Sequence, residues 1–145
     1  MSVRNFALIF GIVYVLVGIL GFIPGIAQDA GAAPPQGEVI GGVRNLLGLF
    51  PINVVHNIVH LLIGLAGLAA SRAYSSSRAY ARAVAIVYGL LTIMGLIPAT
   101  DNMFGLAPLW GHDIWLHALS ALVAAYFGWM APEETTTGTG RVGSY

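Results

Sequence analysis

The sequence predicts an all-α protein, a transmembrane four-helix bundle built from two parallel-repeat helix hairpins. Three observations predict this fold: the composition is strongly apolar, the charged residues leave four long uncharged stretches, and one apolar stretch recurs later in the chain. Of the 145 residues, 57% are hydrophobic and only 8% are charged, with a mean hydropathy of +0.81. A soluble domain carries about 25% charged residues because its surface faces water. The composition therefore excludes an ordinary soluble domain.

The uncharged stretches predict the individual helices, since a helix needs about 20 apolar residues to cross the hydrocarbon core. Four spans follow, near residues 5–26, 52–70, 80–98 and 111–131. Strands are not expected, because the apolar runs do not alternate and lipid permits only helices or closed barrels. Pro51 suits the first turn of the second helix. The first span follows an arginine as a signal peptide would, but its apolar core is too long for one, and we expect it to be retained.

Arginine alone sets the predicted orientation, because the chain has no lysine. The arginines concentrate at the N-terminus, in the loop at 71–82 and in the tail. The positive-inside rule places these segments, and with them both termini, in the cytoplasm. Residues 132–145 are poor in apolar residues, and we expect them to form a disordered cytoplasmic tail.

An internal repeat is the most informative feature of the sequence. Residues 12–24 align without gaps with 86–98, and eight of the thirteen positions are identical. A shorter match pairs 48–51 with 105–108, and the difference in offset reflects extra loop in the first half, at 30–42.

We interpret the matches as a duplicated hairpin. One domain, 1–131, then contains repeat 1 at about 5–70 and repeat 2 at about 80–131. Each repeat has two spans, so the repeats are parallel and related by an axis along the membrane normal.

Each predicted helix carries its polar residue on the same face as its small residues, through which membrane helices pack. The polar side chains should therefore point into the bundle. The alignment places His60 opposite His117 and His56 opposite Asp113. We expect the two histidines of the first pair to meet Tyr14 and Tyr88 near mid-membrane, with the second pair one turn closer to the outside. The four tyrosine and histidine positions lie about 14–15 Å from the flanking prolines.

Three interpretations of this cluster are open. In the first, the hydroxyls of Tyr14 and Tyr88 hydrogen-bond histidine rings and hold the bundle together. In the second, the cluster is a cofactor site: three imidazoles and a carboxylate suit a divalent zinc, iron or copper ion, or His60 and His117 are the axial ligands of one haem. In the third, histidine and aspartate pass protons or ions. The proposed metal or haem residues are His56, His60, Asp113 and His117.

Several functions are excluded or unsupported. The chain has no cysteine, which rules out disulfides and thiolate metal sites. A net charge of zero argues against nucleic-acid binding, and no residue set argues for an enzyme. The expected function is thus a small integral membrane protein with a buried metal or haem cluster. The alternative is a structural or accessory subunit of a larger membrane complex, without a cofactor. Its partners would be the lipid bilayer and either other membrane proteins or further copies of the chain.

Four stretches resemble a known family, namely residues 49–53, 56–61, 80–89 and 112–117. They are similar to bacterial four-span proteins described as domain of unknown function 4383, and the likeness covers about residues 5–130. The resemblance implies a multi-pass protein of the bacterial inner (plasma) membrane. It implies no activity and no substrate.

Overall fold

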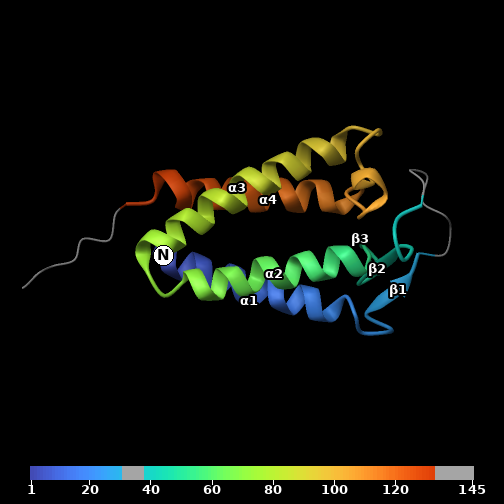
Figure 1. The fold of residues 1–145 in the computed structure, drawn as a ribbon, viewed down its shortest axis with the longest axis horizontal. Helices are drawn as coiled ribbons and strands as arrows, with labels where there is room; N and C mark the ends of the chain where they lie inside the picture. The colour runs from blue at the N-terminus through green and yellow to red at the C-terminus, as the bar shows by residue number, and fades with distance from the viewer. Residues whose placement is uncertain (31–37, 133–145) are drawn as a thin grey trace, which may run out of the picture.

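The computed structural model describes residues 1–30 and 38–132, and within these ranges the chain forms four α-helices in two hairpins with a small sheet at one end (Figure 1). The helices are α1 (Val3–Leu20), α2 (Val54–Ala70), α3 (Tyr74–Leu96) and α4 (His112–Ala125). A 3-10 turn, η1 (Met103–Gly105), precedes α4, and a π-helical turn, η2 (Tyr126–Met130), continues it. The predicted tail, from residue 133 on, and residues 31–37 of the predicted extra loop lie outside the described residues.

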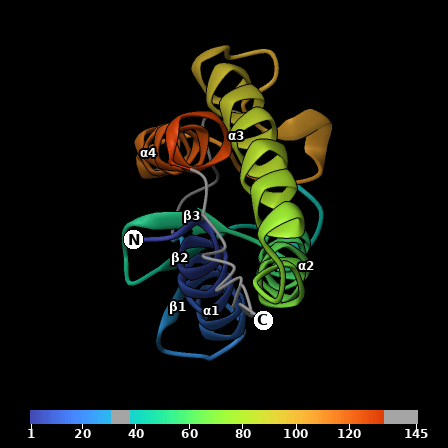
Figure 2. The same cartoon turned by 90° about the vertical axis from the view of Figure 1, so that its left-hand side faces the viewer.

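The first hairpin packs α1 against α2 (Figure 2), and glycines make its closest contacts. A Cβ atom added to Gly11 would lie 2.8 Å from the carbonyl oxygen of Gly64, and one added to Gly64 would lie 2.6 Å from the backbone nitrogen of Val15. The two backbones are therefore in direct contact, as expected for membrane-type packing through small residues.

The second hairpin pairs α3 with α4 and the π-helical turn η2. Gly95 and Gly128 mark its close contacts: added Cβ atoms would lie 2.4 Å from the carbonyl oxygen of Leu109 and 2.9 Å from Cγ of Arg82. The Arg82 Nε donates to the carbonyl oxygen of Gly128 at 2.8 Å, and Arg78 Nε donates to the same oxygen at 3.1 Å. These bonds satisfy a carbonyl that the end of the helix would otherwise leave free.

The hairpins meet along an aromatic core. Phe6 of α1 stacks on Phe127 of η2 with ring centroids 4.8 Å apart, and Tyr14 meets Tyr88 edge-on at 5.4 Å. Tyr80 of α3 donates its hydroxyl to the carbonyl oxygen of Ile63 in α2. The contacts between hairpins are thus made by large side chains, whereas glycines hold each hairpin together.

Helix ends differ from the predicted spans at three places. The third helix begins at Tyr74 rather than near residue 80, within the segment predicted as a loop. The first helix ends at Leu20 rather than near residue 26, and a turn through Pro24 follows it. The expectation that Pro51 opens the second helix is wrong, because Pro51 lies in a strand. Asn53 caps that helix instead, and its side-chain oxygen accepts from the backbone nitrogen of His56 at 2.9 Å.

A small three-stranded antiparallel sheet corrects the expectation that strands would be absent, although the fold remains all-α in class. Its strands are β1 (Ala27–Asp29), β2 (Arg44–Leu46) and β3 (Phe50–Ile52), in that order. Leu47 and Gly48, with φ of 55° and 73°, turn the chain between β2 and β3. The sheet covers the end of the first hairpin (Figure 1), outside the helices.

Two helices, α1 and α3, are long and apolar enough to cross a membrane, and the 17-residue α2 is also apolar. All four helices expose large apolar side chains on the outside of the bundle. They include Leu8, Ile12 and Leu16 of α1, Ile58, Leu62 and Leu65 of α2, Ile86, Leu90 and Ile93 of α3, and Leu119 and Leu122 of α4.

Candidate functional site

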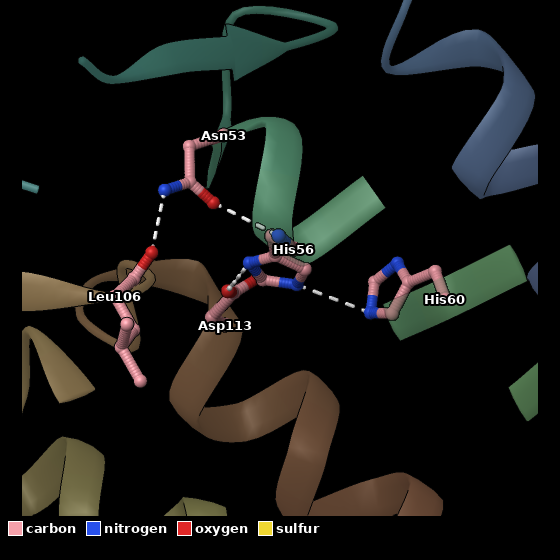
Figure 3. A network of polar contacts seen from close by, with 5 residues as sticks. All are labelled: Asn53, His56, His60, Leu106 and Asp113. Carbon is pink, nitrogen blue, oxygen red and sulfur yellow. Dashed lines mark hydrogen bonds and ion pairs between the residues drawn. The ribbon is translucent and has the colours of Figure 1, made fainter. Parts of the chain in front are cut away.

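The site lies where α2 and α4 face each other near the end that carries the sheet. Asn53 fixes the start of α2 through three hydrogen bonds. Its side-chain oxygen accepts from the backbone nitrogen of His56, and its amide nitrogen donates to the carbonyl oxygen of Leu106 at 2.7 Å (Figure 3). The same amide nitrogen donates to the carbonyl oxygen of Ile40 at 2.9 Å. Because Leu106 precedes α4, Asn53 ties the first turn of α2 to the loop of the other hairpin.

Three histidines come together in this place. His56 and His60 lie one turn apart on α2, with their Nε2 atoms 3.1 Å from each other (Figure 3). His117 approaches from α4, and one nitrogen of each ring lies within 4.8 Å of the others. All three residues are at least 94% buried. The structure therefore gathers three imidazoles from two helices in the buried interior of the bundle.

Asp113 stands beside the histidines on α4, one turn before His117. Its Oδ2 lies 3.6 Å from Nδ1 of His56, and the residue is 2% exposed. This separation is longer than a direct hydrogen bond but short enough for electrostatic attraction. A carboxylate on one imidazole nitrogen orients the ring and leaves the other nitrogen free as a ligand.

The two tyrosines flank the histidines in matching ways. Tyr14 meets the ring of His60 edge-on at 5.0 Å, and Tyr88 meets the ring of His117 edge-on at 5.0 Å. Tyr14 does not form the predicted hydrogen bond to a histidine. Its hydroxyl pairs with Oγ of Ser120 at 3.0 Å instead. The tyrosines therefore support the histidine rings by packing.

All six residues predicted for the site thus lie in one cluster, but nearer one end of the helices than expected. His60 is six residues into α2, or about 9 Å along its axis at 1.5 Å per residue. The prediction of 14–15 Å assumed a helix beginning near Pro51, whereas α2 begins at Val54.

Sequence reasoning missed Ser120 and Asn53. Ser120 follows His117 by three residues and so shares its helical face, a spacing that reveals it once the face is defined. Asn53 directly precedes the apolar run of α2, where asparagine is a favoured N-cap. Nothing in the sequence indicated that the Asn53 side chain would also bond to the other hairpin.

The geometry suits a small metal ion. Two nitrogens bound to zinc at 2.0–2.1 Å with a tetrahedral angle stand about 3.3–3.4 Å apart. The 3.1 Å between the Nε2 atoms of His56 and His60 is close to that distance. A small change in side-chain conformation would bring the ring of His117 to the same ion. A cavity of about 70 Å³ borders all three histidines and provides room for a further ligand.

Comparison with known proteins gives one family. The model of a family described as domain of unknown function (DUF4383) matches residues 4–130 of the chain. No curated protein and no solved structure matches it.

Proposed function

The chain belongs to the family described as domain of unknown function 4383, and from that premise we propose that it is a four-span membrane protein that binds one divalent transition-metal ion. The ligands are His56, His60 and His117, and Asp113 orients His56. The single observation that carries the proposal is the gathering of three buried imidazoles, with a nitrogen of each within 4.8 Å of the others.

The exposed surface supports four spans. Large apolar side chains point outward from every helix, and a soluble bundle would instead place polar residues on that side. The helix α4 together with η2 reaches from His112 to Met130 and has one residue more than α1. In this proposal α2 and α4 cross the bilayer beside α1 and α3.

The arrangement of polar ends supports the orientation and the repeat. Arg4, Arg72, Arg78 and Arg82 lie at or near the α2–α3 turn, so this end and both termini would face the cytoplasm of a bacterial cell. The equal contacts of Tyr14 with His60 and of Tyr88 with His117 fit two hairpins, about 5–70 and 80–131, related by duplication.

A metal ion would also resolve the electrostatics of the site. A buried carboxyl group beside three imidazoles is costly without a compensating charge. Bound zinc would take the neutral imidazole rings as ligands. The carboxylate of Asp113 would orient the ring of His56 and make it a stronger ligand. Iron and copper accept the same imidazole ligands.

The packing favours an ion over haem. The ring of His60 lies 4.4 Å from the ring of His56 and 5.0 Å from that of Tyr14, measured between centroids. A porphyrin held between His60 and His117 would have to separate side chains that are already in contact. We therefore assign these two residues to a single ion.

Metal analysis of the full chain, purified in mild detergent and loaded with zinc, iron or copper, tests the proposal. We expect one ion per chain, retained on gel filtration, and loss of the ion in His60→Ala and His117→Ala. The exposed His112, which accepts from the indole of Trp115, supplies the matched control: His112→Ala should keep the metal. Wild-type protein that holds no stoichiometric ion after loading would refute the proposal and leave a structural or accessory subunit as the better reading.

A further inference from the structure

Two grooves of nearly equal size run along opposite sides of the bundle. One lies between α1 and α4 and has a volume of about 290 Å³; the other lies between α2 and α3 and has about 280 Å³. Five α1 residues of the first groove each have a counterpart 74 positions later in the second. The counterparts of Phe6, Ile9, Phe10, Val13 and Tyr14 are Tyr80, Ala83, Val84, Val87 and Tyr88. The grooves therefore occupy equivalent places in the two hairpins.

The grooves differ at the end nearest the histidines. Ser120 of α4 lines the first groove, and Ile63 of α2 takes the corresponding place in the second, 57 positions earlier. His60 and His117 also line the first groove, whereas no histidine lines the second. Only the α1–α4 groove therefore joins an apolar channel to a polar end.

That polar end holds hydrogen-bonding groups that the described part of the chain leaves unused. The Nδ1 atoms of His60 and His117 are buried and lack a hydrogen-bond partner. Ser120 and Tyr14 share one hydrogen bond, so of their two hydroxyl protons one remains to be donated. All four residues are at least 93% buried. When His60 binds a metal through Nε2, its Nδ1 carries a proton and requires an acceptor.

The lining defines the chemistry of an occupant. Among the described residues, no arginine lines the groove, and the chain has no lysine, so a carboxylate or phosphate would lie at the histidine end without a counter-ion. The aromatic rings of Phe6, Phe10 and Tyr14 follow α1 along the groove, with Phe10 and Tyr14 stacked at 4.3 Å. Such a surface suits a flat ring.

We propose that the α1–α4 groove binds a membrane-dissolved quinone, with a ring carbonyl accepting hydrogen bonds from the Ser120 hydroxyl and His60. A quinone is neutral and planar, and it carries acceptors where the chain offers donors. The proposal rests on the proposed membrane location. It also assumes that His60 binds the proposed metal through Nε2, so that its Nδ1 carries the proton that the quinone accepts. The Ser120 contact depends on neither the histidines nor the metal.

Photolabelling with an azidoquinone tests the occupant. The full chain would be placed in vesicles of phosphatidylethanolamine and phosphatidylglycerol, so that acyl chains compete for both grooves, and labelled peptides would be mapped by mass spectrometry. We expect labelling on α1 and α4, displaced by unlabelled short-chain ubiquinone, and little on α3. Equal labelling of the two grooves, or labelling that ubiquinone does not displace, would show that the probe enters them without a specific site, and would overturn the proposal.

Reciprocal variants separate the polar contact from the shape of the groove. Ser120→Ala removes the hydroxyl without filling space, and loss of one hydrogen bond should weaken quinone competition about three- to ten-fold. Ile63→Ser, the matched change in the other groove, should leave labelling of α1 and α4 unchanged. If Ser120→Ala competes as well as the wild type, the carbonyl contact is refuted even if the protein labels.

Metal content measured on the same samples distinguishes this proposal from the metal site. Quinone labelling in a protein that holds no metal would refute the metal site alone. Stoichiometric metal without displaceable labelling would refute quinone binding alone.

Discussion

The close backbone contact between α1 and α2 makes Gly64→Ala a sharp test of the packing. The new Cβ would lie 2.6 Å from the backbone nitrogen of Val15 and 2.8 Å from the carbonyl oxygen of Gly11. Ordinary contact begins at 3.4 Å, so the helices must separate locally by about 0.8 Å. Backbone atoms cannot rotate away as a side chain can, which leaves separation as the main response.

The magnitude follows from two opposing terms. Overpacking costs about 1–3 kcal/mol, and a backbone contact places Gly64→Ala toward the upper part of that range. Replacing glycine by alanine inside a helix recovers about 1 kcal/mol. The net loss is about 1–2 kcal/mol, or about 2–8 °C in Tm for a chain of this size.

Gly89 supplies the matched control, because it lies inside α3 and an added Cβ would meet nothing within 4 Å. Gly89→Ala should therefore melt at or above the wild-type temperature. Thermal unfolding followed by circular dichroism in one mild detergent would compare the two variants. If Gly64→Ala melts as high as Gly89→Ala, the helices are not packed backbone to backbone and the hairpin assignment fails.

Three further changes test other parts of the structure. Asn53→Ala should lower stability by about 1–2 kcal/mol through loss of the cap, and Asn53→Asp should restore the cap but not the two amide donations to the opposite loop; thermal melts of the pair measure the difference. Arg82→Gln should loosen η2 by removing its bond to Gly128, seen as faster amide hydrogen exchange there with α1 unchanged as an internal reference. Tyr14→Phe should cost about 1 kcal/mol by breaking the bond to Ser120 while keeping the ring contact with His60, so metal content should stay the same; a loss of metal would show that the hydroxyl acts at the site. Acidification should release the metal, because protons compete with the ion for the imidazole nitrogens, and metal that stays bound in strong acid would argue against histidine ligands.

The helices were predictable because apolar composition and length determine them directly. The uncharged stretches located all four, and the small-residue faces indicated which sides pack. The sheet was not predictable in the same way. Each strand has three residues, too few to display an alternating pattern, and the turn at Leu47 and Gly48 depends on a left-handed backbone that loop contacts stabilise.

The site was predictable to the level of residues but not of bonds. Helical spacing and the internal match placed His56 with Asp113 and His60 with His117, since both signals depend only on periodicity and register. Hydrogen bonds depend on side-chain rotamers and on the distance between helices. The partner of Tyr14 therefore became evident only when the structure placed Ser120 beside it.

Because the three histidines lie on two helices far apart in the sequence, they do not become available at the same time during synthesis. His56 and His60 leave the ribosome with the first hairpin, but His117 follows only after α3 and the loop before α4 have been made. Chains are made from the N-terminus, and early segments fold first, so a newly made first half presents two imidazoles without the third. An ion captured at that stage would be held by one helix and exchange readily. If the proposed metal site is correct, secure metal retention would then report that the last helix has docked against the first hairpin.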